Sequence, residues 1–160
     1  MASGVGWLYL AAVLDLYSRS IVGWAMLERI IDRLTVDALS MALRRRQQAA
    51  GLVHHSDQGS QYTSAAYQER LKSYGLRASM NGAGPWYDNA PMESFCGTLR
   101  SECVNHTDYL TRRQARTDIF VYIETWYHQC LLHSALDYVS PEAYELAAVQ
   151  QPAACLSDCL

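Results

Sequence analysis

The strongest constraint on the fold is the alternation of short apolar runs with helical periodicity in the first half of the chain. Apolar runs at residues 7–14 and 21–27 flank the turn sequence Asp-Leu-Tyr-Ser-Arg-Ser and are typical of two strands. Two more short apolar runs, 52–57 and 76–80, each follow a segment with helical spacing. Because strands separated by crossover helices usually run parallel, this order predicts an α/β fold in which helices flank a mixed sheet.

Helices are predicted from apolar spacing and from residues that start or stop helices. Residues 36–50 form an amphipathic segment, with Thr35 placed to cap it and Gly51 placed to end it. A longer helix is expected from about residue 111 to 132. Its apolar stripe consists of Ala115, Ile119, Ile123, Trp126 and Cys130. Near the end of the chain, Ser140 and Pro141 are typical of the start of a short helix.

Length and composition predict one folded domain. The 160 residues are half hydrophobic, which suffices for one core, and no segment is long enough to serve as a linker. We expect the domain to span residues 1–148 and residues 149–160 to form a disordered tail. The first residues lack the basic region of a signal peptide, and their apolar run is too short to cross a membrane.

Net charge and cysteine content limit the functions and the cellular location to be expected. The net charge of −3 argues against tight, autonomous DNA binding, which usually shows as a basic balance. The five cysteines are odd in number, and none of their spacings fits a structural zinc site. Reduced thiols, and with them a cytoplasmic location, are the expectation.

Two carboxylates are the most informative candidates for chemistry. Asp57 ends the third predicted strand, and Glu93 lies in the first turn of the helix that follows a Gly-rich loop. Open α/β sheets place ligands at the carboxyl ends of strands, and a neighbouring helix can supply a second carboxylate to a shared divalent ion. The alternative is that Asp57 opens a turn and Glu93 is an ordinary solvated acid at a helix start.

The surrounding sequence resembles the transposases of bacterial insertion sequences, whose catalytic core is similar to that of retroviral integrases. The resemblance covers nearly all of residues 7–146. The segments that carry it are WLYLAAVLDLYSRSIVGWAM, HSDQGSQYTS, SMNGAGPWYDNAPMESFCGTLRSE and HSALDYVSPEAYE. It implies an RNase H-like fold, with Asp57 and Glu93 as the second and third acids of a DDE set that holds Mg²⁺ or Mn²⁺.

The resemblance also implies that this chain lacks one strand of the family's catalytic core. Relatives carry the first catalytic Asp on a strand that would precede residue 7, and in the RNase H-like order this strand lies at the centre of the sheet. The nearest acid, Asp15, belongs instead to the turn sequence. We therefore expect the sheet to lack its first, central strand, metal binding to be weak and the chain to be inactive alone. Its two flanking strands would have unpaired edges, which favours a homodimer.

Several residues are candidates for DNA contacts. By the resemblance, Arg100 matches a basic position seven residues after the third acid. Trp86 and Asn89 lie on the loop before Glu93, where an aromatic ring could stack on a base, although loop packing is an equal alternative. Arg112 and Arg116 share a helix face.

Two functions of different classes fit these observations. The first is a transposase catalytic core that carries out DNA transposition and integration by Mg²⁺-dependent phosphoryl transfer. The second is a non-catalytic remnant that acts as a dimeric interaction domain.

Overall fold

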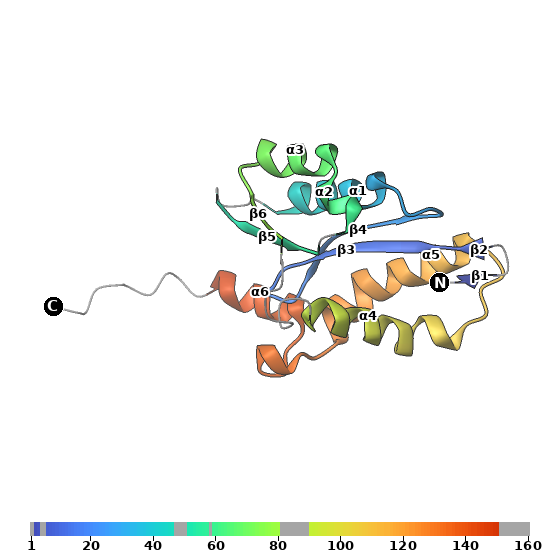
Figure 1. Cartoon of the computed structure of the whole chain (residues 1–160). Coiled ribbons are helices and arrows are strands. Elements are labelled where there is room, and N and C mark those ends of the chain that lie inside the picture. Colours follow the sequence, from blue (N-terminus) through green and yellow to red (C-terminus); the bar gives the residue numbers. More distant parts are fainter. Residues whose placement is uncertain (1, 4–5, 47–50, 58, 81–89, 151–160) are drawn as a thin grey trace.

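The computed structural model describes residues 2–3, 6–46, 51–57, 59–80 and 90–150 (Figure 1). Its strands form three pairs. Two pairs are antiparallel and one is parallel: β1 (Ala2–Ser3) with β2 (Gly6–Trp7), β3 (Tyr9–Leu14) with β4 (Ile21–Leu27), and β5 (Val53–Ser56) in parallel with β6 (Arg77–Met80). The four predicted strands are confirmed.

The other regular elements of the described chain are helical. In order they are α1 (Asp32–Arg45), α2 (Ser60–Thr63), α3 (Ala65–Ser73), α4 (Ala90–Glu102), the 3-10 turn η2 (Val104–His106), α5 (Arg112–Val121), the π-helix η3 (Tyr122–Cys130), the 3-10 turn η4 (Ser134–Leu136) and α6 (Pro141–Gln150). Ser140 caps α6 as predicted, because its hydroxyl accepts from the Ala143 amide at 3.3 Å. Helix α6 continues two residues past the predicted domain boundary at 148, and residues 151–160 lie outside the described part.

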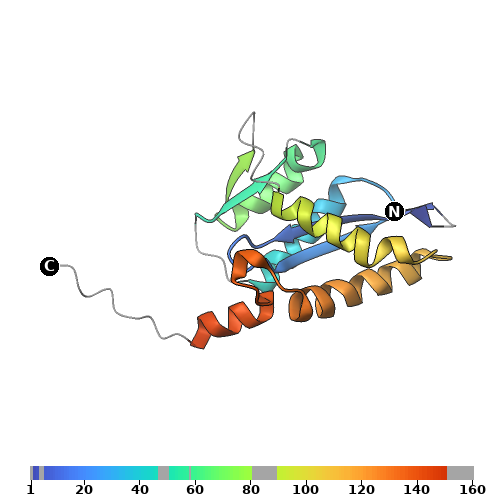
Figure 2. The ribbon, with the colours of Figure 1, turned by 90° about the horizontal axis from the view of Figure 1, so that it is seen from below.

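The elements form layers around the β3-β4 pair. Helices α1 to α3, with β5 and β6, lie on one side of this pair, and α4 and α5 lie on the other (Figures 1 and 2). Each side has its own hydrophobic cluster. The clusters centre on Phe95, Leu99, Ile119, Ile123 and Tyr127 under α4 and α5, and on Leu39, Leu43, Tyr67, Leu71 and Leu76 between α1 and α3. Helices on both sides of a sheet agree with the α/β prediction.

The single mixed sheet is not present among the described residues. β3 pairs only with β4, and β5 pairs only with β6. One edge of β3 and one edge of β5 therefore have no strand partner among the described residues. Every residue of β3 is half-buried, although its sequence, YLAAVL, is apolar on both faces. A strand that is apolar on both faces is typical of the middle of a sheet. This pattern agrees with the expected absence of a central strand.

The predicted helices differ from the structure in their ends and in one buried stripe. Helix α1 ends at Arg45, well before Gly51, and Cys130 is exposed rather than part of the buried stripe. Helix α1 begins at Asp32, so Thr35 lies inside its first turn, where its hydroxyl donates to the Asp32 carbonyl at 3.0 Å. In the long helix, Trp126 is 49% exposed, and Tyr127 is buried in its place. The cause is the π-helix, whose wider i→i+5 turns move the buried stripe by one position.

Candidate active site

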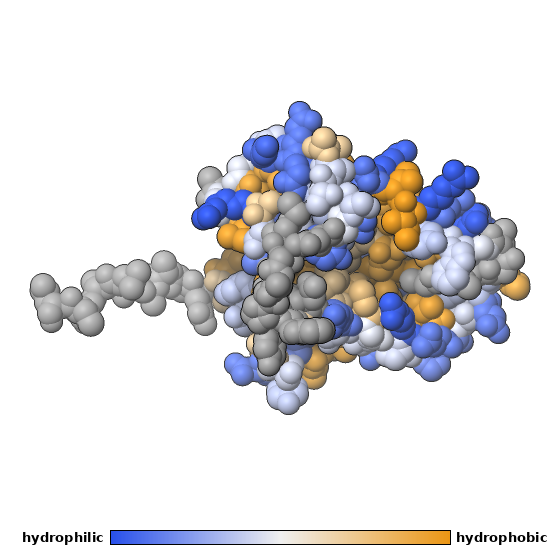
Figure 3. Space-filling view, viewed as in Figure 1, coloured by the Kyte–Doolittle hydropathy of each residue, from blue (hydrophilic) through white to orange (hydrophobic). Residues whose placement is uncertain are grey.

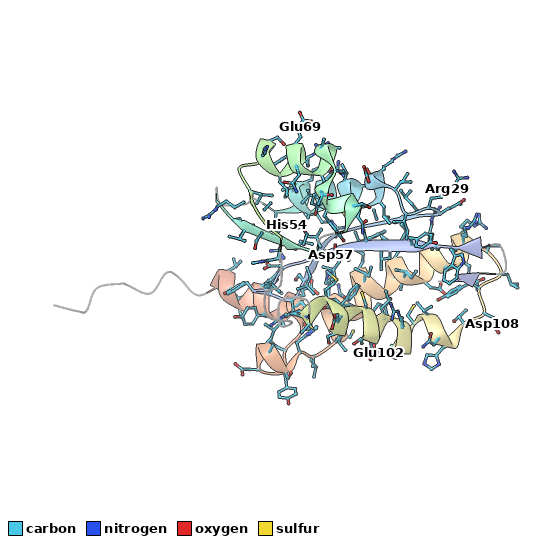
Figure 4. The ribbon with its side chains drawn as sticks, viewed as in Figure 1. Arg29, His54, Asp57, Glu69, Glu102 and Asp108 are labelled. Carbon is cyan, nitrogen blue, oxygen red and sulfur yellow. The ribbon has the colours of Figure 1, made fainter. Side chains whose placement is uncertain are left out.

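Asp57 lies directly after β5, at the carboxyl end of that strand. Its Oδ1 accepts a hydrogen bond from the Gly59 amide at 2.8 Å, so the side chain does open a turn, as in the alternative reading. Its second oxygen accepts no hydrogen bond from the described residues. The side chain is exposed and lies where β5 approaches β3 and α4 (Figure 4).

Glu93 is in the first turn of α4, and its side chain is also exposed. The start of α4 lies beside the end of β5 in both views (Figures 1 and 2). Among the described residues, no ion pair or hydrogen bond engages the Glu93 carboxylate. A carboxylate in the first turn of a helix faces unsatisfied amides and the positive end of the dipole.

Tyr62 and Cys96 are titratable side chains whose charges interact with the candidate carboxylates. Burial raises the pKa of Tyr62, and the charges of Asp57 and Cys96 raise it further. Burial also raises the pKa of Cys96, Arg100 lowers it, and Glu93 raises it. The sequence analysis missed Tyr62 and Cys96, because neither carries the charge that marks a catalytic candidate.

Arg100 lies on the same helix face as Glu93. Positions 93, 96 and 100 follow i, i+3, i+7 spacing, and Cys96 senses both charged neighbours. The Arg100 side chain is exposed, and no described carboxylate lies within 4 Å of it. A positive charge is thus available two turns from the carboxylate.

The other DNA candidates are placed differently. Arg112 forms an ion pair with Glu28 at 2.9 Å, and its Nε and that of Arg116 are buried without a hydrogen-bond partner in the described chain. Glu28 precedes Arg29, which projects at the end of the molecule away from Asp57 (Figure 4). The charge of Arg112 is therefore balanced by Glu28, at the end of the molecule away from Asp57. Trp86 and Asn89 lie outside the described residues.

His54 packs rather than supporting a metal ligand. Its Nε2 is 2.7 Å from the hydroxyl of Tyr67, which is buried between α1 and α3. Burial lowers the pKa of His54, and His55 lowers it further. The ring is thus neutral and hydrogen-bonded to a buried core residue.

The Asp15 carboxylate is hydrogen-bonded within the turn that follows β3. Its two carboxylate oxygens accept from the Tyr17 amide at 2.9 Å and from the Ser18 hydroxyl at 3.1 Å. These bonds hold the β3-β4 connection, in which Arg19 adopts a left-handed φ of 59°. Asp15 therefore has a structural role in this turn.

The donor set suits a hard divalent cation but is small. Asp57 and Glu93 offer the carboxylate oxygens that Mg²⁺ prefers. No group of three or more His, Cys, Asp or Glu side chains that could hold a metal occurs among the described residues. Two carboxylates alone leave most of an octahedral shell to water.

The fold belongs to the RNase H-like class, as comparison with solved structures shows. The chain superposes over its full length, with a TM-score of 0.75 and 15% identity, on 54% of a chain from the cryoEM structure of a simian T-cell lymphotropic virus intasome in complex with the PP2A regulatory subunit B56 gamma. It also matches the HTLV-2 integrase catalytic core domain in complex with magnesium, in a trimeric form. That match has a TM-score of 0.61 and 13% identity, over 87% of this chain and 92% of that one.

Sequence comparison gives the family. Two family models, each described as Integrase core domain, match residues 1–85 and 74–141, and the chain belongs to this family. It is 47% identical over 140 residues to the transposase for insertion sequence element IS904 of Lactococcus lactis. It is 45% identical over 140 residues to the transposase InsF for insertion sequence IS3A of Escherichia coli. The matches cover 88% of this chain, which spans about half the length of each relative.

Within the described ranges, no helix has the length and hydrophobicity needed to cross a bilayer.

Proposed function

We propose that this chain is part of the catalytic core of a transposase that acts on DNA phosphodiesters, with Asp57 and Glu93 as metal ligands. The observation that carries the proposal is that the start of α4, which bears Glu93, lies beside the end of β5, which Asp57 follows (Figures 1 and 2). Support comes from the transposases to which the chain is about 45% identical. The magnesium named for the HTLV-2 integrase core supports the choice of ion.

Each residue has a defined task in this proposal. Asp57 and Glu93 would hold Mg²⁺ or Mn²⁺, which when bound polarises a phosphoryl oxygen and orients the attacking group. The Gly59 amide fixes the orientation of the Asp57 carboxylate. Arg100 contacts a DNA phosphate two turns along α4, where a guanidinium favours bidentate pairing. Trp86, Asn89, Arg112 and Arg116 stay predictions as DNA contacts, and the ion pair with Glu28 makes Arg112 the weaker of the described pair.

The metal site is tested by titrating Mn²⁺ into isotopically labelled protein and following paramagnetic broadening of assigned amide signals. We expect broadening centred on the residues after β5 and the first turn of α4, at millimolar rather than micromolar Mn²⁺, because only two ligands are offered. Asp57→Asn and Glu93→Gln should each abolish it. Asp108→Asn is the matched control, since Asp108 is exposed but lies at the far end of the molecule (Figure 4).

Other outcomes would count against the assignment. Broadening centred elsewhere, or unchanged in Asp57→Asn, would refute the metal ligands. Strand-transfer and nuclease assays on the same 160 residues should show no Mg²⁺-dependent turnover. Turnover abolished by Asp57→Ala would contradict the predicted inactivity while supporting the site.

A second candidate is a dimeric interaction domain, and the open edge of β3 favours it. The half-buried apolar residues of β3 lie between α1 and α4, where the space-filling view shows hydrophobic surface in a hollow (Figure 3). An unpaired strand edge offers backbone donors and acceptors to another strand. The proposed occupant is a second copy of this chain, because edge pairing or strand exchange between identical copies needs no other partner.

A cytoplasmic location, where DNA is accessible, is part of both proposals.

A further inference from the structure

A cavity of about 310 Å³ lies between the β3-β4 turn, α4 and the segment that follows the π-helix. We call it the turn pocket. Its α4 wall consists of positions 91, 94, 95 and 98, which lie on the helix face opposite Glu93. The pocket is therefore separate from the two candidate metal ligands and has no role in the proposed function. Its volume is at the lower end of the range for ligand sites, roughly 300–1,000 Å³.

Much of the lining of the turn pocket is apolar. Leu14, Phe95, Leu131 and Leu132 contribute to it from three separate segments of the chain. Leu132 is 60% exposed, so this apolar lining continues to the surface of the molecule. Concave sites with apolar walls are typical places for an apolar group of another molecule to bind.

Two exposed tyrosines stand on the loops that form the walls, and we call them the rim. Tyr17, in the β3-β4 turn, is 63% exposed, and its ring packs edge-to-face on Tyr144 of α6 at 5.2 Å between centroids. Tyr138 is 71% exposed, on a loop that is closed by a hydrogen bond from the His133 amide to the Val139 carbonyl at 3.2 Å. Tyrosine is enriched at the centres of protein interfaces, because its ring is large and rigid and its hydroxyl is polar.

The same two loops contain strained backbone. Among the described residues, the non-glycine residues with a left-handed backbone are Arg19, with a φ of 59°, Asp137, with a φ of 55°, and Tyr138, with a φ of 60°. Arg19 and Tyr138 have neither the freedom of glycine nor the short polar side chain of Asp that eases this conformation. Residues held in such conformations cluster at ligand-binding positions, so their gathering around one pocket supports a binding role.

Arg19 gives the turn pocket a positive charge. No described carboxylate lies within 4 Å of its guanidinium, and none of the described residues that line the pocket is acidic. The backbone of Arg19 is held in place, because its carbonyl oxygen accepts from the Tyr127 hydroxyl at 3.0 Å. A guanidinium pairs best with a carboxylate or a phosphate, to which it can donate two parallel hydrogen bonds.

A peptide fits these features better than a nucleic acid does. A nucleic acid brings a phosphate with every nucleotide and binds through several cations, whereas Arg19 is the only Arg or Lys among the described lining residues. Asp137 is exposed next to Tyr138, and the chain has a net charge of −3, so a polyanion would be repelled at the rim. A peptide can offer one apolar side chain and one carboxylate.

We propose that the turn pocket and its rim are a docking site for a peptide segment of another protein. The segment inserts an apolar side chain into the pocket and pairs an adjacent Asp or Glu with Arg19, while Tyr17 and Tyr138 contact the residues on either side. This inference goes beyond the proposed function, because the docking site needs neither a metal ion nor DNA.

The test begins with a selection of short random peptides displayed on phage, with the immobilised 160-residue chain as the target. The recovered peptides should share an apolar residue next to an acidic one. A synthetic peptide with this consensus is then titrated, in the presence of EDTA, into isotopically labelled protein. We expect amide shifts at positions 94 and 98 of α4 and at residues 131–135.

Matched variants test the charge of the pocket. Arg19→Gln should weaken binding of the consensus peptide about tenfold, the usual loss for one charge-assisted hydrogen bond. Arg44→Gln removes the same charge from an exposed site on α1 and should have no effect. Leu132→Asp should weaken binding by repelling the carboxylate of the peptide, whereas Leu110→Asp, at an exposed position outside the lining, should not.

Tyr138→Gly separates a binding role of the rim from a structural one. Glycine adopts the left-handed backbone without strain, and the ring that it removes is mostly exposed. We therefore expect a variant that is at least as stable as the parent in urea melts but binds the consensus peptide several-fold more weakly. A residue that served only the fold would not lower binding while stability is kept.

The outcomes also separate this site from the metal site. Binding that survives Asp57→Asn and Glu93→Gln but falls in Arg19→Gln, Leu132→Asp and Tyr138→Gly supports the docking site, whatever the Mn²⁺ titration shows. A selection without a shared sequence, shifts centred elsewhere, or binding that Arg19→Gln and Leu132→Asp leave unchanged overturns it. Single-stranded oligothymidylate that binds in EDTA with the same dependence on Arg19 would indicate a nucleic-acid site and overturn the peptide assignment.

Discussion

At the scale of single residues, two glycines show how tertiary context decides what a side chain would do. Gly23 lies in β4 under α1, and a Cβ added there would come within 2.3 Å of the Ala38 carbonyl oxygen. Gly97 lies in α4, and a Cβ there would have no neighbour within 4 Å. The first glycine permits close packing of helix on strand, whereas the second only weakens its helix.

We therefore expect opposite effects from the same substitution. Gly23→Ala should lower the free energy of unfolding by about 2–3 kcal/mol, because backbone atoms of α1 must move. Gly97→Ala should raise it by about 0.5–1 kcal/mol through helix propensity. Urea denaturation of both variants measures the difference. A Gly23→Ala protein as stable as the parent would mean that α1 does not pack on β4 as described.

At the scale of elements, the π-helix carries a polar cluster that joins it to β4, α1 and α6. His128 Nε2 accepts from the Ile21 amide at 3.0 Å, which requires this nitrogen to be unprotonated. Glu124 accepts from Arg45 and from the Trp24 indole, both at 2.8 Å. Glu145, on α6, is bonded to Ser20 at 2.6 Å and paired with Arg46.

This cluster predicts loss of stability in acid. Burial lowers the pKa of His128 below 6.5, despite the nearby glutamates, so protons bind the unfolded chain first and stability falls as the pH drops below about 6.5. Burial alone would raise the pKa of Glu124 and Glu145, but hydrogen bonds outweigh it and both lie below 4.5. The stability that these ionised carboxylates contribute above about pH 4.5 is therefore lost as the pH falls through their lowered values.

His128→Gln separates the two parts of this dependence. Glutamine can still accept from the Ile21 amide but does not titrate. The free energy of unfolding of this variant, from urea melts, should fall less steeply than that of the parent between about pH 6.5 and 5, with the remaining slope due to His54 and His133, whose pKa values burial also lowers. An unchanged slope between pH 6.5 and 5 would show that His128 is not the group that senses pH.

At the scale of the whole molecule, the unpaired inner edges of β3 and β5 predict a dimer. Light scattering at micromolar concentration should give twice the chain mass of 18.0 kDa. Val53, at the start of β5, is 44% exposed, so Val53→Lys should favour the monomer by charging this edge. Val149→Lys, at an 85% exposed position on α6, is the control. A parent protein with the mass of a monomer would contradict the dimer.

Much of the fold was predictable from sequence because the signals are local. Short apolar runs mark β3 to β6, and Ser140-Pro141 marks the start of α6, since these patterns depend only on neighbours in the chain. Asp57 and Glu93 could be singled out because their places at a strand end and a helix start are also local. The prediction that they share a metal ion could be raised from these placements but gained its support from the family resemblance, because 35 intervening residues carry no distance information.

What the tertiary structure alone decided depends on contacts between distant segments. The shift from Trp126 to Tyr127 in the buried stripe follows from a π-helix that periodicity of 3.6 does not predict. β3 and β5 belong to different strand pairs, and apolar runs alone do not specify which strands pair. The cavity between the β3-β4 turn, α4 and the segment around His133 exists only because these distant segments pack together. Sequence patterns determine which elements form, whereas burial and hydrogen bonding between those elements determine where a ligand can bind.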